Sequence, residues 1–365
     1  MDDRVREHAA VLVDWSARIE EGDDVVVSVA HDAHDLGVAV AEKLGEIGAN
    51  PVYTYSSGEV SRAYLQAHDG GFEVGEHERG LIESADAYLK LGGSRNTAAA
   101  ADVPGDTLAA YRAARTEIGE ARMETDWVST VHPTRALAQA AGMAYEEYAD
   151  FVYDAVLRDW EALAEEMERL KRVLDEGSEV SIENERTDLT MSIDGRTAVN
   201  SCASVAYDSH NLPSGEVFTA PYDTEGEVVF DVPMTVDGRR VQDVRLVFEG
   251  GEVVEYGASM NEDVIEEVVE LDDGSRRLGE LGIGMNRGID RYTDSILFDE
   301  KMAETVHLAL GRAYDACLPD GESGNDSAVH QDFIADMSGE SKLVVDGEVV
   351  QRNGTFRWED GFEEA

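Results

Sequence analysis

The chain has 365 residues, of which 78 are acidic and 30 are basic, so its formal net charge at pH 7 is −48. Such a charge repels phosphate backbones and anionic lipid surfaces, and it excludes nucleic acids and membrane surfaces as partners. Hydrophobic residues nevertheless make up 42% of the chain, and the acids are interleaved with them. This pattern predicts a folded protein, and the length predicts two domains.

The basic residues are five lysines and 25 arginines. Together with the net charge, this scarcity of lysine predicts adaptation to molar salt, which screens repulsion between surface charges; an ordinary acidic cytosolic protein would carry a smaller charge. The two cysteines form no disulfide framework, which favours a reducing compartment. With no apolar run of about 20 residues and no signal-peptide pattern, we expect a soluble cytoplasmic protein.

The first third of the chain alternates short apolar runs with amphipathic stretches. Residues 24–30 predict a buried strand, residues 35–47 a helix, and residues 51–56 and 86–91 two further strands. Strand, helix and strand in this order predict a parallel sheet with helices on its faces. No GxGxxG motif follows the first strand, so a dinucleotide site is not indicated.

A single long helix is predicted over residues 144–175, ending before Gly177. Its apolar residues form one stripe, which favours core or subunit packing over a cofactor site. They are Val152, Val156, Trp160, Leu163, Met167, Leu170 and Leu174. We therefore predict an N-terminal α/β domain, residues 1–177, that ends in this helix.

After residue 178 the pattern becomes alternating segments separated by turn pairs such as Asp194-Gly195, Gly250-Gly251 and Asp346-Gly347. These pairs are typical of β-hairpins. Residues 178–365 are therefore predicted to form an α+β domain with a mainly antiparallel sheet, so that the whole chain is of the α/β class.

Histidines are few and discriminate between sites. Most of the nine lie in the first half on polar stretches and are predicted at the surface, with His31 and His34 at a helix start. His307 and His330 instead lie among apolar residues. On an extended segment His330 and Asp332 face the same side, which suits two metal ligands. The alternative is that Asp332 is simply the hydrogen-bond partner of a buried histidine.

Two glutamates stand at defined points of the second half. Glu216 follows a Pro-Ser-Gly turn and begins an apolar extended segment, where a carboxylate would be held rigidly, unless it is an exposed turn residue. Glu280 lies between glycines in LGELGIGMN, where the backbone could approach a ligand closely. No Lys-Ser/Thr follows, so a phosphate loop is not indicated.

These segments resemble one known family. NLPSGEVFTAP, LGELGIGMN, FDEKMAETVHLALGRAY and SAVHQDFIAD, in this order, are similar to the aminopeptidase T and aminopeptidase S family of dinuclear metallo-aminopeptidases. HPTRALAQAAGMAYEEYADFVYDAV resembles the family's segment ahead of its long helix. The similarity extends over nearly the whole chain.

The resemblance implies five metal ligands and an active-site tyrosine, Tyr314. The implied ligands are Glu216, Glu280, His307, His330 and Asp332. It also implies two divalent metal ions, release of N-terminal residues from short peptides, and a homodimer whose active sites face an enclosed cavity. The connection from Tyr314 to His330 is short and acidic for the family, which puts cavity shape and substrate preference in doubt.

The chemistry of these residues agrees with the ligand set that the resemblance implies. Three carboxylates against the four positive charges of two divalent ions suit a hydrolytic pair of metals, and mixed His/carboxylate ligation suits Zn, Co or Mn. Glu280 is expected to take the proton of the attacking water, and Tyr314 to stabilise the oxyanion. Tyr314 can reach the site only if the chain bends at Gly311. Glu300 is either an extra ligand or proton shuttle or an ion-pair partner of Lys301.

Two other functions remain open at this stage. One is a dinuclear amidohydrolase that acts on non-peptide amides. The other is a non-enzymatic peptide-binding or scaffold protein on the same fold, which the presence of suitable ligand types at all five positions argues against.

Overall fold

The computed structural model describes residues 2–69, 71–236 and 238–363. The chain forms two compact units: unit 1 is Met1–Arg158 with Ala203–Pro213, and unit 2 is Asp159–Cys202 with Ser214–Ala365. The chain thus leaves unit 1 and returns to it for one short segment. The predicted division at residue 177 lies further along the chain than the end of the first part of unit 1.

Unit 1 is built on a parallel five-stranded sheet in the order β2-β1-β3-β4-β8. Its strands are β1 (Asp24–Ala30), β2 (Asn50–Ser56), β3 (Ala87–Gly92), β4 (Asp126–Val131) and β8 (Asn211–Leu212). Val25, Val27, Val29 and Leu89 are buried in the centre of this sheet. The predicted parallel sheet is confirmed, because runs of β-branched residues suit strands that are covered on both faces.

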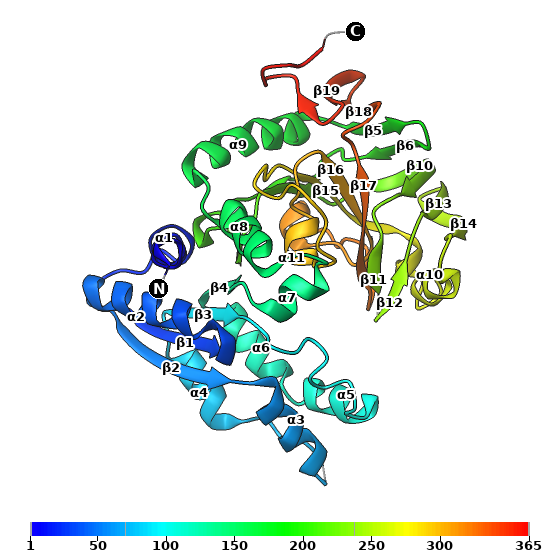
Figure 1. Ribbon diagram of the computed structural model, residues 1–365. Helices are drawn as coiled ribbons and strands as arrows, with labels where there is room; N and C mark the ends of the chain where they lie inside the picture. Colours follow the sequence, from blue (N-terminus) through cyan, green and yellow to red (C-terminus); the bar gives the residue numbers. More distant parts are fainter. Residues whose placement is uncertain (1, 70, 237, 364–365) are drawn as a thin grey trace. The chain divides into compact units, whose positions relative to one another are not determined.

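Helices cover both faces of that sheet. Helix α1 packs on α2, and α4 packs on α6, on opposite sides of the strands in Figure 1. The helices of unit 1 are α1 (Asp3–Ala10), α2 (His34–Ile47), α3 (Gly58–Ala67), α4 (Glu76–Glu83), α5 (Gly105–Ala113), α6 (Thr116–Met123), α7 (Arg135–Ala140) and α8 (Tyr145–Val156). Helix α2 matches the predicted helix closely.

The single helix predicted over residues 144–175 is wrong. The structure has two helices, α8 and α9 (Trp160–Glu176), with a break between them. Asp159 is the reason, because its side chain accepts a hydrogen bond from the backbone N–H of Ala162 and caps a new helix. The apolar stripe continues through the break, and all seven of its residues are buried in this chain as core.

Unit 2 is mainly antiparallel, as predicted, and contains an eight-stranded and a five-stranded sheet (Figure 1). The first has the order β14-β13-β10-β6-β5-β18-β19-β20. Its strands are β5 (Glu179–Asn184), β6 (Thr187–Ser192), β10 (Tyr222–Phe230), β13 (Val244–Glu249), β14 (Glu252–Gly257), β18 (Ser341–Val345), β19 (Glu348–Arg352) and β20 (Thr355–Phe356).

The five-stranded sheet has the order β17-β16-β15-β9-β7. Its strands are β7 (Val199–Ser201), β9 (Glu216–Thr219), β15 (Leu278–Gly284), β16 (Thr305–Gly311) and β17 (His330–Asp336). One face carries the apolar residues Leu281, Leu308 and Phe333, and the Phe333 ring lies 5.4 Å from that of Phe230 in β10. Helix α9 packs on β7 and β9. The opposite face of this sheet is left for other side chains.

Smaller elements complete unit 2. They are the pair β11 (Met234–Val236) and β12 (Arg239–Val241), and the helices α10 (Glu262–Val269) and α11 (Ile296–Asp299). Gly250-Gly251 and Asp346-Gly347 form the expected hairpin turns, between β13 and β14 and between β18 and β19. Asp194-Gly195 does not, because the β5–β6 hairpin closes before it, between Asn184 and Thr187.

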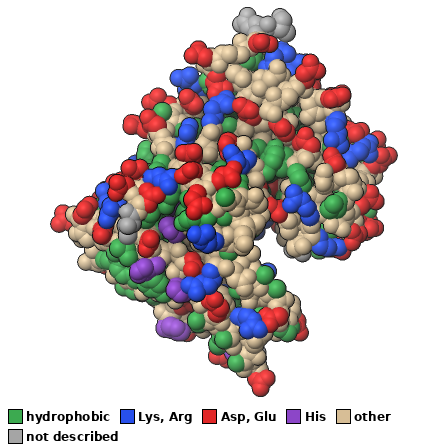
Figure 2. Space-filling model, in the orientation of Figure 1, with side chains coloured by type: hydrophobic (Ala, Val, Ile, Leu, Met, Phe, Trp, Pro, Cys, Tyr) green, Lys and Arg blue, Asp and Glu red, His purple; other side chains and the backbone are tan. Residues whose placement is uncertain are grey.

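Acidic side chains are spread over the visible face of the molecule, with arginines and lysines between them (Figure 2). Many of the exposed arginines pair with carboxylates, as Arg245 does with Glu227 and Glu255. Within the described residues, no helix is both long and apolar enough to cross a membrane.

Candidate metal centre

All five predicted ligands lie on the face of the five-stranded sheet that is opposite Leu281 and Phe333. Strand pairing sets Ala309 of β16 between Glu280 and Asp332, and it sets His307 opposite Gly282. Residues that alternate along a strand share one face, so Glu280 and Gly282 lie on the same side. His330 and Asp332 both lie on β17, which confirms the prediction that an extended segment places them on the same side.

Glycines make room for the site. A Cβ atom on Gly282 would lie 1.9 Å from Nε2 of His307, and one on Gly284 would lie 1.9 Å from the carbonyl oxygen of Met302. Any larger residue would therefore displace the imidazole or the chain that leads into β16. These glycines admit other parts of the same chain, and their role in letting the backbone approach a ligand stays a prediction.

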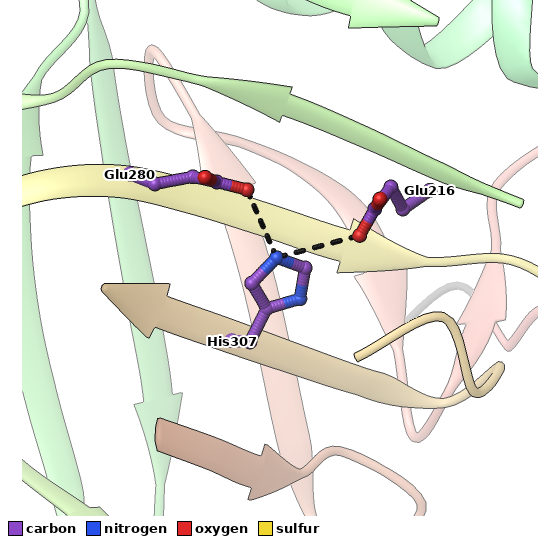
Figure 3. Close-up of side chains that lie close together, drawn as sticks. All are labelled: Glu216, Glu280 and His307. Carbon is purple, nitrogen blue, oxygen red and sulfur yellow. Dashed lines mark hydrogen bonds and ion pairs between the residues drawn. The ribbon is translucent and has the colours of Figure 1, made fainter. Parts of the chain in front are cut away.

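Three of the ligands form a first group, which Figure 3 shows converging on one imidazole. Nε2 of His307 lies 3.1 Å from Oε1 of Glu280 and 3.5 Å from Oε2 of Glu216. All three side chains are buried, with exposed fractions of 1% for His307, 5% for Glu280 and 7% for Glu216. Glu216 is therefore not an exposed turn residue.

A second group consists of Glu280, His330 and Asp332. Nε2 of His330 lies 3.3 Å from Oε2 of Glu280 and 3.8 Å from Oδ1 of Asp332. The latter distance is too long for a hydrogen bond, so Asp332 is not simply the partner of this histidine. His330 Nδ1–H donates to the carbonyl oxygen of Arg312 at 2.9 Å, which leaves Nε2 free for a metal.

Glu280 belongs to both groups, and within each group the ligand atoms lie within 4.8 Å of one another. Its Oε1 faces His307 and its Oε2 faces His330. Among the described residues, the buried Oε2 of Glu216 has no hydrogen-bond donor. A buried carboxylate oxygen without a donor is costly unless a cation satisfies it, so the donor set fits bound divalent cations.

The carboxylates and histidines of the cluster shift one another's pKa values. Burial alone would raise the pKa of Glu280, but hydrogen bonds from His307 and His330 outweigh it and lower the pKa to about 2. Burial likewise opposes the charge on His330, yet the hydrogen bond to Glu280 and the charge of Asp332 raise its pKa to about 9. A metal that binds here must therefore displace protons from the histidines.

Tyr314 stands beside the second group. Strand β16 ends at Gly311, where φ is +102°, a conformation that favours glycine, so the predicted bend is confirmed. The ring of Tyr314 then lies 4.9 Å from that of His330 and 5.7 Å from that of Phe218. Partial burial, with the charges of Glu280 and Asp332 next in importance, raises the pKa of Tyr314, so that its hydroxyl is a donor at neutral pH.

Two neighbours of the cluster, Lys301 and Phe218, were not among the predicted site residues, and Lys301 was expected only as an alternative partner of Glu300. Lys301 is fully buried and contacts both Glu216 and Glu300, so Glu300 is an ion-pair partner and lies outside the two ligand groups found among the described residues. Phe218 shares the face of β9 with Glu216. The rarity of lysine and the two-residue spacing on an extended segment were the available signals.

The histidines of unit 1 are placed differently from one another. His31 and His34 are exposed at the start of α2, as expected. His8 and His132 are buried, and the prediction that such residues lie at the surface is wrong for these two. The charged residues next to His8 in the sequence indicated an exposed position. They lie on the outer side of an amphipathic helix, however, and His8 lies on its inner side.

Comparison with known proteins decides the family. The profile of the thermophilic metalloprotease family M29 matches residues 1–357. The chain belongs to the M29 family. It is therefore a metal-dependent aminopeptidase, in agreement with the resemblance found in the sequence.

Two named relatives align with the chain along nearly their whole length. Aminopeptidase T of Thermus aquaticus is 28% identical over 93% of this chain and 93% of its own, and aminopeptidase 2 of Geobacillus stearothermophilus is 26% identical over 96% and 97%. Among solved structures, wild-type AmpT from Thermus thermophilus superposes with a TM-score of 0.84 at 25% identity, covering 97% of this chain and 99% of that one. The α/β fold of the family is thus shared.

Proposed function

We propose that this aminopeptidase releases N-terminal residues from short peptides with two divalent cations. Glu216, Glu280 and His307 would hold one cation, and Glu280, His330 and Asp332 the other. The observation that carries this proposal is the position of Glu280, whose two oxygens face different histidines. Paired hydrolytic metals need such a bridging carboxylate.

The donor set supports a proposal for the kind of cation. Imidazole nitrogen mixed with carboxylate oxygen suits Zn, Co or Mn better than Mg or Ca. Neutral imidazoles are required, and the hydrogen bond from His330 Nδ1–H to Arg312 supplies the correct tautomer for one of them.

When bound, the cations would activate water and polarise the scissile carbonyl. Tyr314 would donate its hydroxyl hydrogen to the carbonyl oxygen as negative charge develops there. Glu280 would take the proton of the attacking water and pass it to the leaving amine, as expected from the sequence. For this role, one of the two oxygens of Glu280 would have to be free of a cation.

The class of substrate distinguishes the proposed aminopeptidase from the competing function, a dinuclear amidohydrolase. An aminopeptidase binds the free α-amine, whereas an amidohydrolase of non-peptide amides does not need it. The family membership favours peptides. A homodimer with an enclosed cavity would restrict these peptides to short or unfolded chains, and size-exclusion chromatography with light scattering would test the dimer.

Metal removal and reconstitution test the function. We expect chelation to abolish hydrolysis of a short peptide in molar NaCl, re-addition of Zn, Co or Mn to restore it, and N-acetylation of the peptide to prevent it. Equal hydrolysis of free and acetylated peptides would favour the amidohydrolase, and activity that survives chelation would refute the metal mechanism. Because the acidic surface binds divalent ions loosely, only metal that restores activity counts.

Salt adaptation and a cytoplasmic, reducing location are further parts of the proposal. With a net charge of −48, the surface carboxylates repel one another strongly. Salt screens this repulsion, because the Debye length falls from about 10 Å at 0.1 M salt to about 3 Å at 1 M. We expect the melting temperature to fall when NaCl is lowered from molar to 0.1 M. An unchanged melting temperature without added metal or ligand would contradict salt adaptation.

A further inference from the structure

Lys301 lies at the edge of the candidate metal centre with no exposed surface. Its Nζ is 3.6 Å from Oε1 of Glu216, and it also contacts Glu300. The chain has only five lysines, and Lys43, Lys171 and Lys342 all keep part of their side chain in solvent. A buried ammonium is costly unless it is paired, so these carboxylates account for its position.

The fold directs Lys301 to Glu216 through its backbone. The N–H of Lys301 donates to the carbonyl of Phe298 at 3.0 Å, and its carbonyl accepts from the N–H of Asn286 at 3.0 Å. Gly284 pairs with Glu216 across β15 and β9, and it has no side chain to keep the 301–302 backbone away. Lys301 is thus held near the start of β9, where Glu216 lies.

The two oxygens of Glu216 consequently have different surroundings. Oε1 faces the ammonium of Lys301, whereas Oε2 lies 3.5 Å from Nε2 of His307 and has no hydrogen-bond donor in the described part of the chain. The carboxylate is therefore oriented, with one oxygen engaged by a fixed cation and the other turned toward the first ligand group.

We propose that Lys301 is a positioning residue that holds Glu216 so that only Oε2 binds the cation of the first group. The inference rests on the proposed role of Glu216 as a ligand. Lys301 itself does not contact substrate, since it is completely buried. Without its charge, Glu216 would be free to rotate beside two other carboxylates, and the first group would bind metal more weakly. The group of Glu280, His330 and Asp332 would keep its geometry.

The alternative is that Lys301 only pairs with Glu300 to stabilise the turn before β16. The two roles make different predictions for Lys301→Met and Glu300→Gln. If Lys301 positions Glu216, the first variant weakens metal binding and the second does not. If the pair only stabilises the turn, both variants lower the melting temperature and neither changes one metal site selectively.

The experiment is calorimetric titration of the chelated full-length variants with Zn²⁺ in molar NaCl, counting only sites that Glu280→Gln lacks. We expect Lys301→Met to weaken one of two sites by about tenfold or more, the range seen when a group that orients a metal ligand is lost. The other site should stay within about threefold, and kcat should fall with little change in KM. Lys171→Met, a lysine paired with Asp175, is the matched control and should change neither site.

Each other outcome would overturn the inference. These are unchanged affinities in Lys301→Met, an equal loss at both sites, or a selective loss that Glu300→Gln reproduces. Should Lys301→Met not fold, Lys301→Gln is titrated instead, and failure of both to fold would assign the lysine to the fold. Absence of two Glu280-dependent sites in the unmodified protein would instead refute the proposed metal centre, whatever the lysine variants do.

Discussion

Two histidines, a fully buried one in unit 1 and a partly buried one in unit 2, show what distinguishes a candidate metal ligand from a core residue. His8 of unit 1 is completely buried, and its only described hydrogen-bond partner is Thr130, whose Oγ1 lies 2.7 Å from Nε2. Burial, and secondarily His132, lowers the pKa of His8 to about 3. His330 of unit 2 faces two carboxylates, and its pKa is raised to about 9.

Burial of a histidine is therefore not by itself evidence of a metal site. Without an acidic neighbour a buried imidazole stays neutral and serves packing. With two carboxylates it holds a proton or a metal, and the sheet of unit 2 places three carboxylates on one face. Replacing His330 should therefore lower catalysis, whereas replacing His8 should change folding stability.

The largest expected effect is from His330→Ala. Loss of this proposed ligand should lower peptide hydrolysis by on the order of 10³-fold or more, because metal activation supplies several kcal/mol of transition-state stabilisation. The fold in molar salt, measured by circular dichroism, should persist. His34→Ala, at an exposed histidine, is the control. Unchanged turnover in His330→Ala would refute the site.

A smaller loss is expected from Tyr314→Phe. Removing one oxyanion donor typically lowers kcat by about 10²-fold to 10³-fold, and the ring contacts with His330 and Phe218 would remain. Steady-state kinetics should show a lower kcat with KM nearly unchanged. A rise in KM alone would instead assign Tyr314 to substrate binding.

The smallest effect concerns stability, in His8→Gln. The folded pKa of about 3 lies below the unfolded value near 6.5, so only the unfolded chain takes up the proton between these values. Folding stability therefore falls as pH drops below about 6.5, by up to about 1.4 kcal/mol per pH unit, and the variant should lack this part. Melting temperatures from pH 7 to pH 4.5 test it, with His34→Gln as control; identical slopes would contradict the prediction.

The local chemistry of the sequence determined much of the fold and the types of the candidate ligands. Strand β1 and helix α2 follow directly from apolar runs and periodicity, since these depend on neighbours along the chain. The shared face of His330 and Asp332 follows from the two-residue period of a strand. The helix break at Asp159 was also local, but the continuous apolar stripe concealed the cap.

Only the tertiary structure decided how the cluster is arranged. Strand register brings Glu280 between His307 and His330, and no periodicity within a single strand specifies that register. The space left by Gly282 and the burial of Lys301 against Glu216 likewise depend on residues distant in sequence. The sequence, through its resemblance to a known family, thus indicated which groups could bind metal, whereas pairing between distant strands decided which of them meet.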